Sequence, residues 1–517
     1  MTTVRDSVID FLRDKGMTVM FGNPGSTELP LYRHWPEDFR YILGLQESAV
    51  LSMADGYAQA SGKAAVINLH SAAGLGHAMG SLVSAYKNQT PLIVTAGQQA
   101  RSLLLAEPFL GAVDPTAMPK PYVKWACEPA SAAETPQAIA RAYAIAMTPP
   151  KGPVFVSIPV DDWDQPSGLV QPLDFLGSPA PGKKAIAEIL PRINAAKKPV
   201  MVLGPEVDRA GGWSAAIELA EKLACPVWTS PMSSRCSFPE SHPQFAGFLR
   251  ADETSVFETL APHDLVLVIG APAFTYHFEN PAPNPLAADL LQFTNDATIA
   301  SYTKKGAIIL GDVASAMEML LPGVEKRPSF KGVLRAAPQP APILSLSAAA
   351  IVDLLQALRP ENALIAEEAP SARPAIQQRL RIDTPGSFFA TASGGLGFAG
   401  SAAVGAALAH PDKRTIALLG DGSALYTIQA LWTAAKENLP VTYIIINNGG
   451  YEALIGIARR WQTPSVGTDL SGLDFVNLAE GFGMKARRAT TCAEMEKALG
   501  EAFAFQGPSL IDAIVED

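Results

Sequence analysis

Short runs rich in valine, isoleucine and leucine alternate with alanine-rich helical patterns along most of the chain, and glycine, proline or aspartate stands at the joins. Such runs are typical of strands that are buried on both faces of a parallel sheet. They form three groups: 41–46, 64–70, 91–97 and 152–159; 198–205, 226–230, 264–270 and 306–312; and 362–368, 414–422, 441–448 and 508–516. We therefore predict an α/β fold class with three doubly wound, mostly parallel-sheet domains.

Two proline-rich stretches with little periodicity, 164–184 and 325–342, separate the three groups and are typical of linkers. A chain of 517 residues is also too long for a single hydrophobic core. We expect domains at 1–180, 181–340 and 341–517.

The net charge of −10 and the pI near 5.3 argue against nucleic acid or an anionic membrane surface as a partner. A small molecule is therefore the expected partner. No apolar run is long enough to span a bilayer, and residues 1–16 have the pattern of an amphipathic helix rather than of a signal peptide. The four cysteines lack the spacing of a disulfide framework or a zinc site. These features predict a cytoplasmic protein.

Two polar side chains follow two successive strands of the third group. Asp421 stands at the end of the strand in 414–422, and Asn448 ends the strand 441–448, one strand-helix-strand unit later. We expect them on neighbouring strand tips, where they and the carbonyl of Gly450 offer the hard oxygen ligands that magnesium prefers. The helix that we expect over 424–438 begins at the same place.

The amides of Gly422 and Ser423 lie at this predicted helix start, which suits a bound phosphate. Either glycine-rich segment alone is more simply a tight turn. The two together, at this interval and on two strand ends, favour a site for a metal and a diphosphate.

A second turn, in "TVMFGNPGSTELP" (18–30), also joins a strand pattern to a possible helix start, which is a common place for an anion. The turn itself does not identify the anion.

Several long segments resemble one family. The GDGS motif followed by NN is similar to the diphosphate-binding motif of thiamine-diphosphate (ThDP) enzymes, and the layout resembles their pyrimidine-binding, central and diphosphate-binding domains. Within them the chain most resembles the benzoylformate decarboxylases among the 2-oxo acid decarboxylases, through "FGNPGSTELP", "FRYILGLQESA", "ADGYAQASGKAAVINLHSAAGLGHAMG", "PLIVTAGQQ", "VLVIGAPAFTYH" and "SGGLGFAGSAAVG". The resemblance implies ThDP and Mg²⁺ (or Ca²⁺) as cofactors. It also implies non-oxidative decarboxylation of an aromatic or bulky 2-oxo acid to an aldehyde and CO₂.

The resemblance assigns four catalytic residues. Glu47 matches the glutamate that hydrogen-bonds N1′ of the aminopyrimidine ring. His70 and His277 match the active-site histidines that transfer protons and polarise the substrate carbonyl. Ser26 is left facing the thiazolium, so the anion at the 18–30 turn is expected to be the carboxylate of the 2-oxo acid. No family role transfers to His77, which suits packing or the rim of the pocket equally well.

The resemblance also implies cofactor contacts. Leu396 matches the bulky apolar residue that bends the cofactor, and Gly394 offers a carbonyl to its amino group. Asp421, Asn448 and Gly450 would hold the metal. The other implied cofactor contacts are Asn23, Pro24, Gly25, Gly422, Ser423 and Tyr451.

The expected substrate pocket departs from the family. Ala390 and Ile457 stand where aromatic side chains are usual. Pro370 and Arg373 stand where small hydroxyl residues are usual. Arg373 would pair with a second anionic group of the substrate if it points inward, or it faces solvent. The remaining expected pocket residues are Phe109, Leu110, Ala453 and Leu454.

Two alternatives are also compatible with the sequence. A ThDP-dependent carboligase or lyase, of the acetolactate synthase or benzaldehyde lyase type, shares Glu47 and both glycine-rich motifs, but having both His70 and His277 favours decarboxylation. A dinucleotide-binding oxidoreductase or a non-catalytic scaffold is weaker, because the chain has no GxGxxG motif in the right setting. No flavin motif is readable. The family resemblance implies sites between subunits and a homotetramer, a dimer of dimers.

Overall fold

The computed structural model describes residues 2–170, 177–330, 338–339, 341 and 345–515. It contains three six-stranded sheets with flanking helices, which confirms the predicted fold class. The chain divides into two compact units: the first is Met1–Leu176, Ala341–Arg373 and Thr391–Asp517, and the second is Gly177–Pro340 and Pro374–Ala390. The two predicted linkers, 164–184 and 325–342, lie partly outside the described residues.

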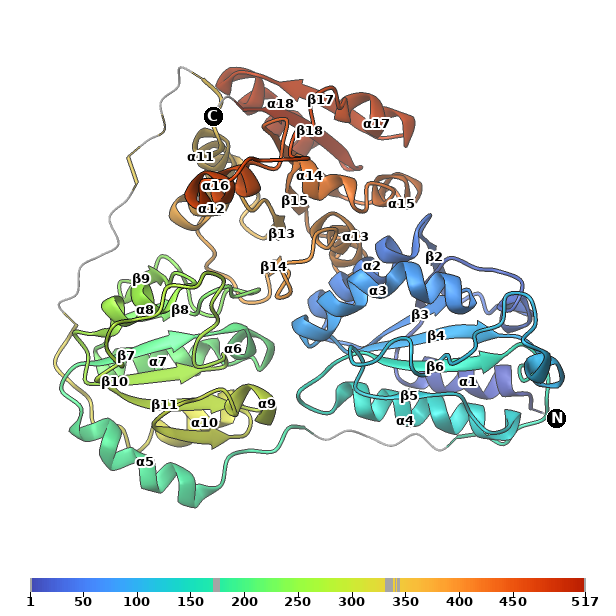
Figure 1. Ribbon diagram of the computed structural model, residues 1–517, viewed down its shortest axis with the longest axis horizontal. Helices are drawn as coiled ribbons and strands as arrows, with labels where there is room; N and C mark the ends of the chain where they lie inside the picture. Colours follow the sequence, from blue (N-terminus) through green and yellow to red (C-terminus); the bar gives the residue numbers. More distant parts are fainter. Residues whose placement is uncertain (1, 171–176, 331–337, 340, 342–344, 516–517) are drawn as a thin grey trace. The chain divides into compact units, whose positions relative to one another are not determined.

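The first sheet has the order β2-β1-β3-β4-β6-β5, and all its strand pairs are parallel. Helices α2 and α3 cover one face, and α1 and α4 cover the other (Figure 1). The elements are β1 (Val19–Gly22), β2 (Arg40–Leu43), β3 (Ala65–Leu69), β4 (Leu92–Gln98), β5 (Ala126–Cys127), β6 (Val154–Pro159), α1 (Val4–Asp14), α2 (Glu47–Ser61), α3 (Ser71–Asn88), α4 (Thr135–Met147) and the 3₁₀ helices η1 (Leu29–Tyr32), η2 (Arg101–Ala106) and η3 (Ala132–Glu134).

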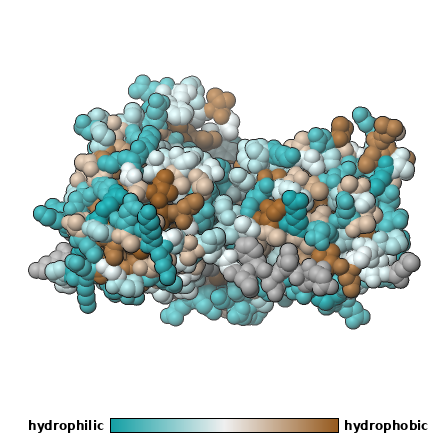
Figure 2. Space-filling model, turned by 90° about the horizontal axis from the view of Figure 1, so that it is seen from below, coloured by the Kyte–Doolittle hydropathy of each residue, from teal (hydrophilic) through white to brown (hydrophobic). Residues whose placement is uncertain are grey.

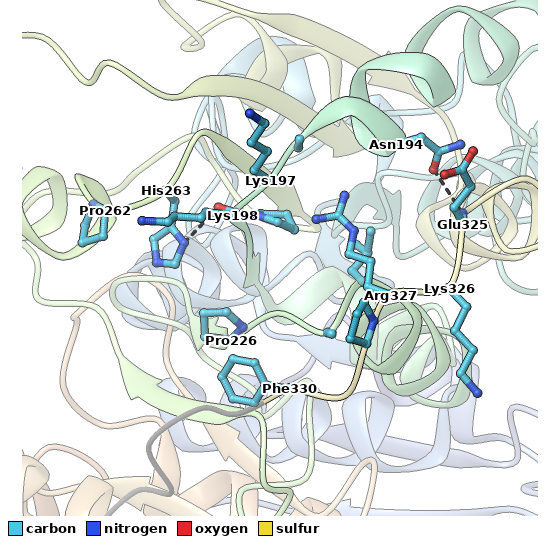
Figure 3. A pocket seen from close by; sticks show the side chains of 15 residues that line it. Asn194, Lys197, Lys198, Pro226, Pro262, His263, Glu325, Lys326, Arg327 and Phe330 are labelled. Carbon is cyan, nitrogen blue, oxygen red and sulfur yellow. Dashed lines mark hydrogen bonds between the residues drawn. The ribbon is translucent and has the colours of Figure 1, made fainter.

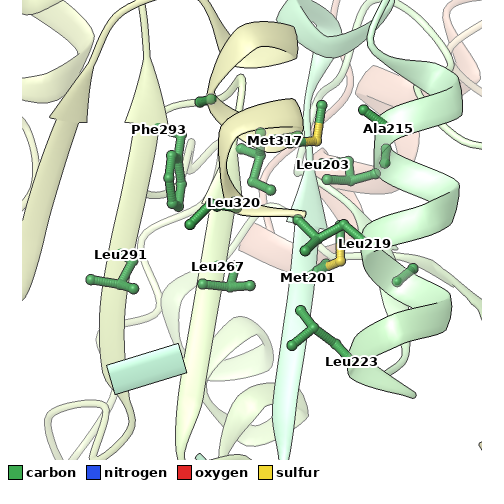
Figure 4. Close-up of a cluster of buried hydrophobic side chains, with 14 of the residues drawn as sticks. Met201, Leu203, Ala215, Leu219, Leu223, Leu267, Leu291, Phe293, Met317 and Leu320 are labelled. Atoms are coloured by element: carbon green, nitrogen blue, oxygen red, sulfur yellow. The ribbon is translucent and has the colours of Figure 1, made fainter. Parts of the chain in front are cut away.

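The central sheet has the order β12-β11-β10-β7-β8-β9 and is also parallel. Met201, Leu267 and Leu291 project from three adjacent strands toward Leu219 of α7 and Met317 of α10 (Figure 4). The alternate residues of these strands are buried on the opposite face, which explains the unbroken apolar runs in the sequence. The elements are β7 (Pro199–Leu203), β8 (Val227–Thr229), β9 (Phe245–Phe248), β10 (Leu265–Ile269), β11 (Asp289–Thr294), β12 (Ala307–Leu310), α5 (Lys183–Ala195), α6 (Pro205–Arg209), α7 (Trp213–Leu223), α8 (Glu253–Leu260), α9 (Ala297–Ala300) and α10 (Val313–Leu320).

The third sheet has the order β14-β13-β15-β16-β18-β17. Its elements are β13 (Leu364–Glu368), β14 (Phe388–Ala390), β15 (Thr415–Gly420), β16 (Val441–Asn447), β17 (Lys485–Ala489), β18 (Ser509–Ile514), α11 (Ala348–Leu358), α12 (Arg373–Arg379), α13 (Ala399–Ala409), α14 (Asp421–Leu425), α15 (Ala430–Lys436), α16 (Glu452–Trp461), α17 (Phe475–Gly481) and α18 (Cys492–Ala504).

The helix expected over 424–438 is one point where the sequence prediction was wrong. The structure breaks it into α14 and α15. At the break the hydroxyl of Thr427 donates to the carbonyl of Gly397 at 3.0 Å, and the amides of Ala430 and Leu431 bond to carbonyls three residues back. This contact therefore anchors the break to the loop that precedes α13.

Helices α2 and α13 join the first and third sheets within the first unit, and they do so through glycines. A Cβ atom on Gly56 would lie 2.5 Å from the Cα atom of Ala402, and one on Gly405 would meet the carbonyl oxygen of Met53 at 1.9 Å. Only glycine allows backbones to approach this closely. The helix that begins at Glu47 is therefore packed against the helix that follows the Leu396 loop.

On the face of the molecule shown in Figure 2, hydrophobic residues form small separate patches among hydrophilic ones. Among the described residues, no helix combines the length and the apolar character needed to cross a membrane. All four cysteines are free thiols.

Candidate active site

Three predicted catalytic residues lie at the carboxyl edge of the first sheet. The turn that carries Ser26 follows β1 in the chain. Glu47 is the first residue of α2, which follows β2, and His70 lies between β3 and α3. Since β1 lies between β2 and β3, the strand order reverses there. In α/β sheets ligands bind outside the carboxyl ends of strands at such a reversal.

The turn after β1 is anchored to the protein interior by a hydrogen bond, and its Ser26 hydroxyl faces the solvent. The side-chain amide of Asn23 donates to the carbonyl of Gly44 at 3.0 Å. Pro24 and Ser26 are exposed, while Thr27 and Glu28 behind them are buried.

The Glu47 carboxylate contacts His77, a pairing that sequence reasoning left open. Glu47 Oε2 lies 3.0 Å from His77 Nδ1, and the Glu47 side chain is 14% exposed against 63% for His77. Gly74 passes close to the other carboxylate oxygen, since a Cβ atom there would lie 3.4 Å from Glu47 Oε1. His77 therefore covers the carboxyl group from the solvent side.

His70 is hydrogen-bonded through Nδ1 to the carboxylate of Glu28 at 2.9 Å. Sequence reasoning missed Glu28. The only local signal was a glutamate two residues after Ser26, which by itself is typical of a surface turn.

His277 belongs to the second unit, after β10. Its ring is exposed and packs edge-on against Phe278, with 4.3 Å between ring centroids. Its backbone amide donates to the carbonyl of Ala251 at 2.8 Å. Its catalytic role stays a prediction.

The expected metal ligands do lie on neighbouring strand tips, because β15 and β16 pair in parallel up to Gly420 and Ile446. Asp421 Oδ2 accepts a hydrogen bond from the Gly450 amide at 2.9 Å, and Asn448 Oδ1 lies 3.3 Å from the same nitrogen. Burial raises the pKa of Asp421, while the amides of Gly422 and Gly450 oppose that shift.

These donors fit a hard cation such as Mg²⁺, since both are oxygens and one is a carboxylate. In the part of the chain that the structure describes, no three His, Cys, Asp or Glu side chains gather into a metal cluster. A metal held at Asp421 would therefore need further oxygens from backbone, amide groups or a bound phosphate.

Tyr451 closes over the start of α14. A Cβ atom on Gly422 would lie 2.2 Å from the Tyr451 ring, so only glycine fits beneath it. Ser423, the next residue, is buried.

The loop with Gly394 and Leu396 is anchored by Glu368, a second residue that sequence reasoning missed. Glu368 ends β13, and its carboxylate accepts hydrogen bonds from the amides of Gly397, Phe398 and Ala399 at 2.6–2.8 Å. It therefore ties the start of α13 to the sheet. The only local signal was a pair of glutamates at a strand end.

The buried carboxyl group of Glu368 should make the stability of the folded protein depend on pH. Burial outweighs the three amide hydrogen bonds and raises its pKa from 4.5 to about 7. Between these values the folded protein keeps a proton that the unfolded chain has lost, so this contribution to stability is fully present below pH 4.5 and is lost as the pH rises to about 7. We expect the Tm of the apoprotein to fall more steeply over this range in wild type than in Glu368→Gln, measured by circular dichroism. Parallel curves for the two proteins would contradict the assignment.

The expected pocket residues have mixed surroundings. Arg373 Nη2 pairs with the buried Glu367 carboxylate at 2.5 Å. Ala390 is fully buried, whereas Phe109 is 86% exposed and Leu110 lies beside it. Helix α16, which carries Ala453, Leu454 and Ile457, has no fully buried residue.

A separate cavity of about 630 Å³ lies at the amino-terminal edge of the central sheet (Figure 3). Lys197 and Lys326 on its lining point away from each other (Figure 3), and Arg327 donates to the carbonyl of Ile193 at 2.8 Å. None of the predicted site residues lines it. Its basic side chains do not converge on one point, so we do not assign it to the site.

Three family models match successive parts of the chain. They are the N-terminal TPP binding domain of thiamine pyrophosphate enzymes over residues 2–118, their central domain over 186–320 and their C-terminal TPP binding domain over 371–513. The chain belongs to the thiamine pyrophosphate (ThDP) enzymes.

Individual relatives narrow this class. Benzoylformate decarboxylase of Pseudomonas aeruginosa is 44% identical over 522 residues, which cover 99% of this chain and 98% of that protein. The crystal structure of benzoylformate decarboxylase from Polynucleobacter necessarius matches with a TM-score of 0.98 at 37% identity, covering 100% of this chain and 99% of that one. The ThDP-dependent 4-hydroxybenzoylformate decarboxylase of Rhodococcus jostii RHA1 matches with a TM-score of 0.96 at 41% identity, covering 99% of both chains. These relatives confirm the sequence-based assignment as a ThDP-dependent 2-oxo acid decarboxylase, which is a carboxy-lyase.

Proposed function

We propose that the protein decarboxylates an aromatic 2-oxo acid of the benzoylformate type, with ThDP and Mg²⁺, to an aldehyde and CO₂. The observation that carries the proposal is the placement of two residue sets. The carboxyl edge of the first sheet carries Ser26, Glu47 and His70. The carboxyl edge of the third sheet carries Asp421 and Asn448.

When bound, ThDP supplies a nucleophilic carbon and an electron sink. The chain's own residues hold the cofactor and the substrate and move protons. Glu47 would hold N1′ of the aminopyrimidine, Ser26 would bind the substrate carboxylate, and His70 and His277 would transfer protons. At the other end, Asp421, Asn448 and Gly450 would hold the metal and Gly422, Ser423 and Tyr451 the diphosphate.

The surroundings of Arg373 support a substrate with a neutral side chain. Its guanidinium already pairs with the buried carboxylate of Glu367. Withdrawing it to bind a second anionic group would leave that carboxylate unpaired, which is costly in a buried site. An aromatic or bulky aliphatic group therefore fits the proposed site better than a second carboxylate.

We further propose a homotetramer with domains 1–180, 181–340 and 341–517, located in the cytoplasm. Several large apolar side chains support assembly, because a single chain leaves them in water: Leu105 is 99% exposed, and Phe109, Val113, Trp461 and Val466 are largely exposed. They lie in the segment after β4 and around α16, which carry expected pocket residues. If the active sites are shared between subunits, a neighbouring subunit would cover both the segment after β4 and the region around α16.

A substrate panel tests the function. Benzoylformate, a bulky aliphatic 2-oxo acid and 2-oxoglutarate are each incubated with the protein, ThDP and Mg²⁺, and the aldehyde is measured. We expect kcat/KM for benzoylformate to exceed that for 2-oxoglutarate by at least about tenfold, and EDTA to abolish turnover. Absence of aldehyde from every acid would contradict the proposal.

The carboligase alternative is tested in the same assay by adding acetaldehyde. We expect free benzaldehyde to remain the main product from benzoylformate. A 2-hydroxyketone as the main product would make the protein a carboligase instead.

A further inference from the structure

Glu28 is an almost fully buried carboxylate, with a side chain that is 1% exposed. It lies just after β1, where the strand order of the first sheet reverses. Four groups contact its two oxygens. The hydroxyl of Thr27 and the amide of Gly97 donate to Oε1 at 2.6 and 3.0 Å, while the amide of Gly25 at 2.8 Å and His70 Nδ1 at 2.9 Å contact Oε2. A carboxylate has about four lone-pair sites, and all of them are used here.

Two glycines make room for this arrangement. A Cβ atom on Gly25 would lie 2.1 Å from His70 Nδ1, and one on Gly97 would lie 2.1 Å from Glu28 Oε1. Real Cβ atoms do not approach other atoms this closely, so any larger residue would push the ring or the carboxylate away. The turn after β1 and the end of β4 are thus shaped around the contact between Glu28 and His70.

The contacts fix which ring nitrogen carries the proton. An ionised carboxylate only accepts hydrogen bonds, so His70 Nδ1 must donate to Glu28. Thr27 leads to the same result: its hydroxyl proton points to Glu28 Oε1, so its oxygen, 3.1 Å from Nδ1, can only accept from the ring. In the neutral imidazole, Nε2 is then left without a proton and is free to accept one.

We propose that Glu28 is a positioning residue for the reaction. It holds the His70 ring in one orientation and keeps its proton on Nδ1, so that Nε2 exchanges protons with the substrate. Glu28 does not itself touch the substrate. This inference rests on the proposed function, in which His70 transfers protons.

Glutamine at position 28 separates this role from simple packing. Where its NH₂ group takes the place of Oε2, it donates to His70 Nδ1 and favours the opposite tautomer, with the proton on Nε2. In either orientation one backbone amide, of Gly25 or of Gly97, loses its acceptor. We expect Glu28→Gln to lower kcat for benzoylformate by about 100-fold or more, with KM and ThDP affinity changed by less than about threefold.

A double-mutant cycle shows whether the effect passes through His70. We expect Glu28→Gln to change kcat by less than about threefold when it is added to His70→Ala. Asp162→Asn is the matched control, because Asp162 is another carboxylate of this sheet that is 1% exposed, and it binds Arg101 and Thr135 rather than a histidine. This control should change stability but not kcat. Equal losses from Glu28→Gln with and without His70 would overturn the proposal.

A second measurement does not depend on the variant folding. Solid-state ¹⁵N spectra of wild-type protein labelled at its seven histidines, with His70 assigned by comparison with His70→Ala, should show a protonated Nδ1 and an unprotonated Nε2. The reverse tautomer would overturn the proposal even if decarboxylation is observed. Failure of the wild type to decarboxylate any 2-oxo acid, with the expected tautomer present, would contradict the proposed function instead.

Discussion

Replacement of Glu47 by glutamine is expected to lower kcat for decarboxylation by at least about 10²-fold while the chain still folds and binds ThDP. Glutamine keeps the size of the side chain but cannot exchange a proton with N1′ of the aminopyrimidine. The cost to folding is small, because Glu47 is the first residue of α2 and contributes one charge at a helix N-terminus. Steady-state kinetics with benzoylformate, together with ThDP titration by fluorescence, separates the two effects.

Glu496→Gln is the control for this variant. Glu496 is an exposed glutamate on α18, so the same change of chemistry there should leave kcat unaltered. A Glu47→Gln protein with full activity would show that this carboxyl group does not drive the reaction.

The sequence predicted best the elements whose side chains are buried on both sides. Strands β15 and β16 are almost entirely buried, so their composition is apolar throughout and their boundaries are clear. Strand β17 was missed because three of its five residues are exposed and its sequence, KARRA, has no apolar run. Strand β11 was also missed. Its buried residues include the polar Gln292, which interrupts the apolar run and whose side-chain amide donates to the carbonyl of Ala271.

The site followed the same logic. Asp421 and Asn448 could be predicted as neighbours because successive strands of one local unit place their tips side by side. Glu28 and Glu368 were not predicted, because the partners that connect them to the site are distant in sequence: His70 lies 42 residues from Glu28, and Gly397 lies 29 residues from Glu368. In a single sequence a buried glutamate cannot be told from an exposed one, since only the tertiary fold supplies the amides and the ring that satisfy it.

The Arg373 prediction shows a related limit. Arg373 was singled out from the sequence as a departure from the family pattern, with the substrate or solvent as its expected partner. The structure supplies a third partner six residues away, the buried carboxylate of Glu367. The sequence contained both residues, but the turn between β13 and α12 that brings them together is visible only in the fold.

Asp421→Asn is expected to raise the apparent Kd for ThDP in the presence of Mg²⁺ by at least about 100-fold, on a scale of about 1.4 kcal/mol per tenfold change. The metal requires the negative charge of Asp421, because the other expected donors, Asn448 and Gly450, are neutral. Burial already raises the pKa of this carboxyl group, so a neutral asparagine relieves an unfavourable charge in the empty protein. The variant should therefore keep or gain thermal stability without cofactor while it loses cofactor affinity.

Two further measurements make this prediction specific to the charge. Because the raised pKa means that acid protonates Asp421 readily, wild-type affinity for ThDP with Mg²⁺ should fall as the pH is lowered, whereas the weak affinity of Asp421→Asn should change less. Asp469→Asn is the matched control, since Asp469 is exposed and forms a backbone bridge with Gly450 without offering its carboxylate to Asp421's partners. That control should bind ThDP as the wild type does. If Asp421→Asn bound ThDP and Mg²⁺ as tightly as the wild type does, the Asp421 carboxylate would be excluded as a metal ligand. None of the other expected metal donors is acidic, so none of them could replace its charge.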